Sequence, residues 1–78
     1  MSYRRLEGPT EATTQEQAQA LVMVDLNELV YWAKHRQENG FVHGWESGAG
    51  VERQYLIIFG WYAETWTRTL VGERDLGG

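Results

Sequence analysis

The chain has 78 residues, a net charge of −4 from 11 acidic and 7 basic residues, and no cysteine. A chain of this length makes one small domain, and the lack of cysteine excludes disulfides and thiolate zinc sites. The basic residues are scattered along the chain, which makes a nucleic-acid partner unexpected. Because disulfides and thiolate zinc sites are excluded, the stability of this small domain must come from aromatic packing or from association with another chain.

No segment has the pattern of a membrane span or a secretory signal. The longest apolar run is residues 55–63, whereas a membrane-spanning helix needs about 20 residues. Arg4 and Arg5 near the N-terminus are not followed by an apolar stretch. Together with the absence of cysteine, these features predict a cytoplasmic protein that does not bind membranes.

Residues 1–12 are expected to form an irregular N-terminal arm, because Gly8-Pro9 interrupts regular structure. Thr13 and Glu16 then have the spacing of a capping box. No Gly or Pro follows until position 40, so residues from about 14 to 38 are predicted to form a long helix. Its apolar face contains Val22, Met23, Leu26, Leu29, Val30 and Ala33.

Asp25 is the irregular position in this predicted helix. It begins a second capping pattern, "DLNE", which offers the alternative of a break near Val24. We favour a continuous helix, because no residue around position 25 forces a turn. Residues 39–50 contain several glycines together with Phe41 and Trp45. They are expected to form a loop whose aromatic rings fold back over the helices.

Residues 51–71 decide the fold class, and two interpretations compete. Apolar residues spaced three or four apart predict a second helix, on which Glu64 and Arg68 form a favourable pair. The many β-branched and aromatic residues instead suit a hairpin with its turn at residues 59–62. That register would place Ile57 opposite Glu64 and mix apolar with charged side chains, so we favour the helix.

The predicted fold class is therefore mostly α, a helical hairpin that dimerises. It has a long helix at about 14–38, an aromatic-anchored glycine-rich loop at 39–50 and a second helix at about 51–71. The alternative is an α+β fold with a helix packed on a small antiparallel sheet formed by 41–71. Residues 13–72 would make a single small domain, and residues 73–78 a flexible tail.

Candidate catalytic and metal-binding groups are weak. His35, His43 and Glu46 do not have a recognised metal spacing and lack a fourth ligand. Neither serine, Ser2 or Ser47, lies in a nucleophile motif. We expect a non-enzymatic protein without a cofactor or metal.

Aromatic residues outside the helical stripes point to binding instead, since Trp and Tyr are enriched at binding hot spots. The predicted partner-binding residues are Tyr31, Trp32, Trp45, Trp61, Glu64 and Arg68. They suggest a small protein–protein interaction module, an inhibitor or regulator that binds through an aromatic patch with an acidic rim. Its size and charge are those of small regulators encoded by phages and other mobile elements. The alternatives are a structural homo-oligomer subunit and a protein that stacks single-stranded nucleic acid on its tryptophans.

Overall fold

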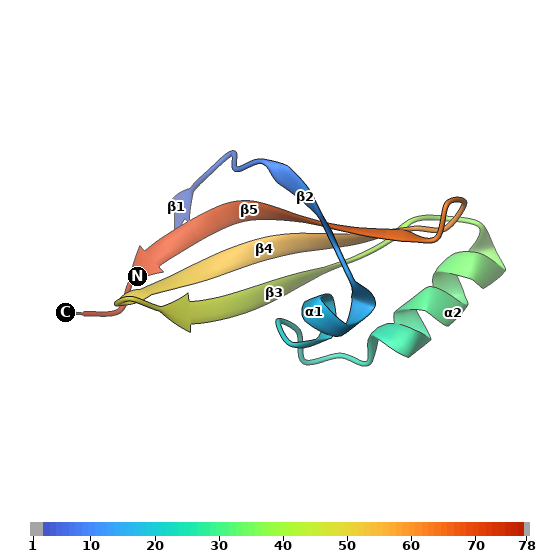
Figure 1. Cartoon of the computed structure of the whole chain (residues 1–78), viewed down its shortest axis with the longest axis horizontal. Helices are drawn as coiled ribbons and strands as arrows, with labels where there is room; N and C mark the ends of the chain where they lie inside the picture. Colours follow the sequence, from blue (N-terminus) through green and yellow to red (C-terminus); the bar gives the residue numbers. More distant parts are fainter. Residues whose placement is uncertain (1–2, 78) are drawn as a thin grey trace.

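The computed structural model describes residues 3–77 as a five-stranded antiparallel sheet with two helices packed on one face (Figure 1). The three long strands follow one another in the chain and pair as neighbours, and the two short strands both pair with the remaining edge of β5. The strands are β1 (Arg4–Arg5), β2 (Thr10–Thr13), β3 (Gly40–Gly48), β4 (Val51–Gly60) and β5 (Thr65–Asp75). The helices are α1 (Gln15–Gln19) and α2 (Leu26–Arg36).

The predicted helical hairpin is wrong, and the α+β alternative fits. Residues 51–71 form β4 and most of β5 instead of a second helix. The turn between the strands is residues 61–64, where Glu64 has a φ of 55° and its N–H donates to the Gly60 carbonyl at 2.8 Å. This turn pairs Ile57 with Arg68 and leaves Glu64 outside the strands. The hairpin register expected from the sequence is therefore wrong: Ile57 lies opposite Arg68, four residues beyond Glu64.

The two faces of the sheet follow from this register, because side chains alternate along a strand. Ile57 and Phe59 of β4 and Trp66 of β5 face the helices and are buried. Leu56 and Ile58 therefore point to the opposite face, which neither helix covers. β4 is apolar on both sides, so its sequence lacks the alternation that usually marks a strand.

The continuous helix predicted for residues 14–38 is also wrong. α1 ends after Gln19, and α2 begins after Asp25, whose carboxylate accepts from the Asn27 N–H at 2.9 Å as an N-cap. The Gln19 side chain holds the connection between them: it donates to the Val24 carbonyl at 2.7 Å and accepts from the Leu26 N–H at 2.9 Å. The break at the "DLNE" pattern is thus the correct alternative.

The loop predicted for residues 39–50 is mostly strand β3, paired with β4 from Gly40 to Gly48. Two of its glycines serve close packing. A Cβ on Gly40 would lie 2.4 Å from Leu29 of α2, and one on Gly44 would lie 2.8 Å from the Leu21 carbonyl. A glycine-rich segment therefore makes an edge strand here, since only glycine lets the helices and their connection approach it so closely.

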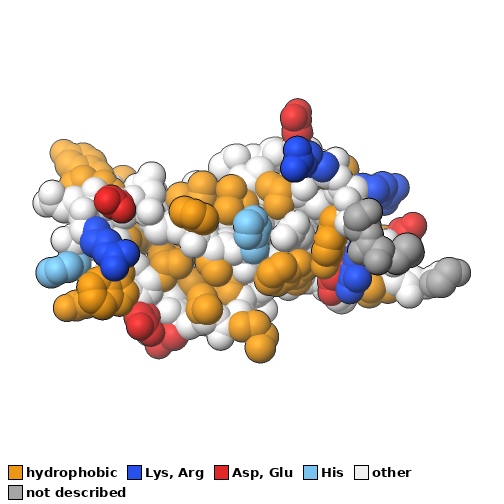
Figure 2. Space-filling model, turned by 180° about the vertical axis from the view of Figure 1, so that it is seen from behind, with side chains coloured by type: hydrophobic (Ala, Val, Ile, Leu, Met, Phe, Trp, Pro, Cys, Tyr) orange, Lys and Arg blue, Asp and Glu red, His pale blue; other side chains and the backbone are white. Residues whose placement is uncertain are grey.

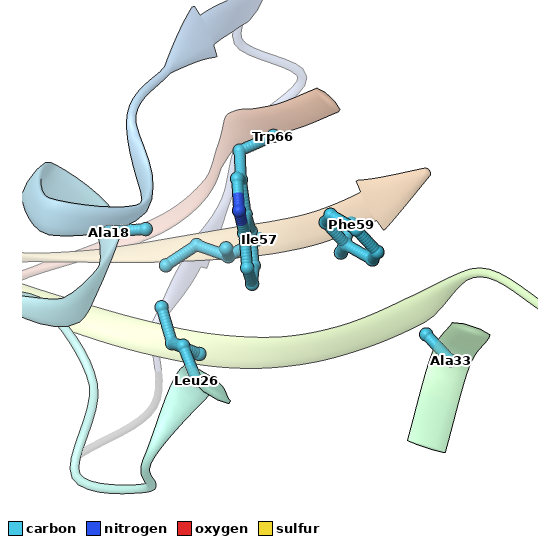
Figure 3. Packing of buried hydrophobic residues seen from close by; sticks show 6 residues of the cluster. All are labelled: Ala18, Leu26, Ala33, Ile57, Phe59 and Trp66. Carbon is cyan, nitrogen blue, oxygen red and sulfur yellow. The ribbon is translucent and has the colours of Figure 1, made fainter. Parts of the chain in front are cut away.

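The core lies between the helices and the β4–β5 hairpin (Figure 3). The Phe59 and Trp66 rings are tilted against each other with centroids 5.0 Å apart. The predicted N-terminal arm lies along β5, where β1 and β2 pair with it, and β5 itself continues to Asp75. The buried residues are Ala18, Leu26, Ala33, Ile57, Phe59 and Trp66.

Replacing Gly44 with alanine should destabilise the fold. The new Cβ would meet the Leu21 carbonyl at 2.8 Å and the Ile57 side chain at 3.0 Å, and overpacking of this kind costs about 1–3 kcal/mol. Gly48→Ala, in the same strand with no atom within 4 Å of its new Cβ, is the matched control and should be neutral or slightly stabilising. Urea unfolding of both variants measures the difference. Equal stability of the two variants would contradict the packing at Gly44.

Candidate interaction surface

A groove runs between α2 and the outer edge of β3, which is an edge strand of the sheet. Two hollows, of about 260 and 410 Å³, share Leu29, Trp32 and Phe41 among their lining residues. We call this feature the α2–β3 groove. The smaller hollow is also lined by Ala33, Arg36, Glu38, Asn39 and Gly40, and the larger one by Val24, Asp25, Glu28 and Val42.

Exposed aromatic residues lie at the groove and next to it: Trp32 and Phe41 are lining residues of its hollows, and Tyr31 lies beside Trp32 on α2, outside them. The exposed fractions are 43% for Trp32, 69% for Phe41 and 61% for Tyr31. On α2 these rings are held by their neighbours: Tyr31 packs edge-on against Trp32 with centroids 5.2 Å apart, and the Arg36 guanidinium lies 5.0 Å from the Trp32 centroid. Tyr31 is also stacked on His35. The aromatic side of α2 is therefore ordered before anything binds to it.

Carboxylates outnumber cations along the groove. Asp25, Glu28 and Glu38 line the two hollows, against the single cation Arg36. None of these three carboxylates forms an ion pair with another residue in the range 3–77. The groove thus presents unpaired negative charge beside its aromatic rings.

The backbone of β3 offers hydrogen-bonding groups to the groove. The Trp45 N–H points away from β4, because it donates to the Leu21 carbonyl at 2.8 Å. Backbone groups alternate in direction along a strand, so the N–H and C=O groups of Phe41 and His43 also point outward. Within residues 3–77 no backbone group pairs with them. The β3 edge is therefore open at residues 41–43 and closed at Trp45. We call the hydrogen bond from the Trp45 N–H to the Leu21 carbonyl the Leu21 clasp.

The uncovered face of the sheet carries an apolar strip. The pairing register places Phe41 beside Ile58, and His43 beside Leu56, on the side away from the helices. Figure 2, the view from behind, shows hydrophobic side chains along the middle of the molecule. Antiparallel sheets that face water usually carry polar residues there. Here β5 follows that rule with Thr67 and Thr69, whereas Leu56 and Ile58 of β4 form an apolar strip with Phe41 of β3.

The six predicted partner-binding residues do not form one surface. Trp32 lines the groove with Tyr31 packed beside it on α2, and Trp45, which is 42% exposed, follows on β3 beyond the open edge. Trp61 is half-buried against the core, and its backbone N–H donates to the Asn39 side-chain oxygen at 3.2 Å.

The two charged residues of that set are engaged elsewhere. Glu64 lies in the β4–β5 turn, 3.0 Å from Lys34. Arg68 lies on the helix side of β5, with its Nε 3.5 Å from a Glu11 carboxylate oxygen, an ion pair without hydrogen-bond geometry. Phe41, which borders the groove, was missed because its segment was interpreted as a loop. Its alternation with His43 and Trp45 was the available signal of a strand.

The residues considered for metal binding are not brought together. His35 lies on α2, whereas His43 and Glu46 lie on β3, where their odd and even positions direct them to opposite faces. Residues 3–77 contain no cluster of three potential ligands.

A polar cluster lies at the end of the sheet remote from α2. The Tyr3 hydroxyl donates to the Glu52 carboxylate, and Arg74 Nε donates to the same oxygen at 2.9 Å. The hydrogen bond from Tyr3, helped by the charge of Arg74, lowers the pKa of Glu52. The same hydrogen bond, with some desolvation, raises the pKa of Tyr3 above 10.0. The cluster ties the N-terminal arm to the sheet.

Comparisons with protein-family models, curated proteins and solved structures found no match. Neither helix in residues 3–77 has the length and apolar character needed to cross a membrane.

Glu52→Gln should lower the pKa of Tyr3 towards 10.0, because it removes the carboxylate that accepts the hydrogen bond from the Tyr3 hydroxyl. The pH dependence of the Tyr3 ring carbon shifts, followed by NMR in both proteins, measures this. Glu16→Gln, which removes a carboxylate on α1, is the control and should leave the titration unchanged. An unchanged Tyr3 midpoint in Glu52→Gln would contradict the hydrogen bond.

The same cluster has a defined pH window for stability. The lowered pKa of Glu52 contributes stability above its unfolded value of about 4.5, and that contribution disappears as pH falls through the folded pKa. The raised pKa of Tyr3 contributes stability below 10.0, and it is lost as pH rises through the folded pKa. The stability difference between the wild type and Glu52→Gln should thus be present at pH 7 and smaller at both extremes.

Proposed function

We propose that this chain is a non-enzymatic interaction module that binds another protein through the α2–β3 groove. The observation that carries the proposal is the exposed ring of Trp32, which lines the hollows beside the unpaired backbone groups of Phe41 and His43 on an edge strand. Exposed aromatic rings next to a hollow are typical of binding hot spots. By occupying a segment of its partner, the module would act as an inhibitor or regulator.

The ordered aromatic side of α2 supports this role energetically. A ring that is already held by its neighbours loses little conformational freedom on binding, so more of its contact energy contributes to affinity. Trp32 is held in this way by Tyr31 and Arg36. The size and acidic charge of the chain suit small regulators, including those of phages. A chain without cysteine suits a reducing compartment, and we propose the cytoplasm.

Binding of single-stranded nucleic acid receives less support. Most basic side chains already lie within ion-pair distance of an acid, which leaves little free positive charge for phosphates. These paired residues are Arg4, Lys34, Arg53, Arg68 and Arg74.

Trp32→Ala should weaken partner binding about 30-fold, the equivalent of roughly 2 kcal/mol for a hot-spot residue. The measurement uses a displayed library of protein fragments from the source organism, selected on the wild-type chain and then titrated against variants. Tyr62→Ala is the matched control, since Tyr62 is 85% exposed but lies in the β4–β5 turn away from the groove. Equal effects of the two substitutions, or no retained fragment, would contradict the proposed function.

A second candidate function is that of a homodimer subunit, favoured by the uncovered sheet face. Leu56 and Ile58 are half-buried in the central strand β4, and Phe41 lies beside them. The charged residues Glu52 and Arg74 at the end of this face pair with each other, so two copies could meet there without strong repulsion. Packing two such faces together would bury the apolar centre of both.

Ile58→Lys should convert such a dimer into a monomer, because it places a charge in the centre of the apolar face. Light scattering at several concentrations measures the mass against 9.0 kDa for one chain. Tyr62→Lys adds the same charge in the exposed turn and should keep the wild-type mass. A wild-type mass of one chain at all concentrations would eliminate this candidate.

A further inference from the structure

We infer that the α2–β3 groove takes an extended segment of its partner, basic and apolar, which adds to β3 as a further strand. This inference rests on the proposed function and specifies the partner of the same site. Its starting point is the open edge at Phe41 and His43. Adding a strand to such an edge satisfies the outward backbone groups of both chains.

The groove can also accommodate a side chain of the added strand. Strands pair about 4.8 Å apart, and alternate residues point to opposite faces. A residue of the added strand that points to the helix side would enter the hollow of about 410 Å³, which is lined by Leu29, Trp32 and Val42 among others. These three side chains form an apolar part of the wall, so a large apolar side chain suits the position that contacts them.

Charge complementarity defines a second feature of the segment. Asp25 and Glu28 line the same hollow and have no cationic partner in the part of the chain that the structure describes. A lysine or arginine next to the apolar residue would pair with them. The net charge of −4 attracts a basic segment from a distance as well.

A second copy of this chain fits the groove less well than a basic segment does. Edge-to-edge pairing of two copies would place one β3 against the other, and residues 40–48 contain no lysine or arginine. The carboxylates of both copies would then lie unpaired near the new strand. The partner we infer is therefore a different chain.

The test uses a displayed library of random twelve-residue peptides, selected on the wild-type protein. We expect enrichment of peptides that combine apolar residues with lysine or arginine. His43→Pro removes one outward N–H and leaves the ladder with β4 intact, because proline is tolerated where an edge N–H faces away from the sheet. It should weaken binding of an enriched peptide at least tenfold, whereas the matched control His43→Ala should change it less than threefold.

A further protein variant and a modified peptide complete the test. Glu28→Lys should weaken binding of the basic peptides about tenfold. An enriched peptide with alternate backbone amides methylated loses the donors that strand addition needs, and it should bind at least tenfold more weakly than the parent peptide to the unmodified protein. This second measurement decides the question even where His43→Pro fails to fold.

The possible results separate the two proposals. If His43→Pro and the methylated peptide bind as well as their controls while Trp32→Ala weakens binding, strand addition is wrong and the proposed function stands. If no peptide is enriched but protein fragments bind through Trp32, the inferred extended segment is wrong. If Trp32→Ala has no effect on any bound probe, both proposals fail.

Discussion

The pairing of β4 with β5 determines every surface of this protein. The turn at residues 61–64 sets Phe59 opposite Trp66 and Ile57 opposite Arg68, and these positions define which face meets the helices. A shift of one residue would turn the same apolar side chains to the other face. With only two short helices in residues 3–77, one face is covered and the other is not. The groove exists because α2 ends its coverage at the outer edge of β3.

Parts of this fold could be predicted from the sequence, and the failures have physical reasons. The capping pattern at Asp25 correctly indicated a helix start, but helix continuity was preferred because nothing there breaks a helix by itself. The break comes from tertiary contacts of Gln19 with both sides of the connection. In β4, residues 55–59 are apolar on both faces, so neither periodicity is visible. The threonines of β5 were the better signal, as β-branched residues favour strands.

The candidate site was predictable only in part, because it depends on a contact between distant segments. Tyr31 and Trp32 could be selected from their positions outside the apolar stripe of a helix. Phe41 could not be added without knowing that residues 40–48 form a strand beside α2. The close approach itself depends on Gly40, and a glycine gives no indication of which element will pack against it.

The Leu21 clasp limits the length of strand that can pair with the edge of β3. A long exposed edge strand invites unfolded chains to pair along it and is a hazard for aggregation. Here the Leu21 carbonyl occupies the Trp45 N–H, so a chain that pairs at residues 41–43 cannot continue along the strand. The open part of the edge is thereby limited to residues 41–43, which is shorter than the long exposed edges on which extended strand pairing builds.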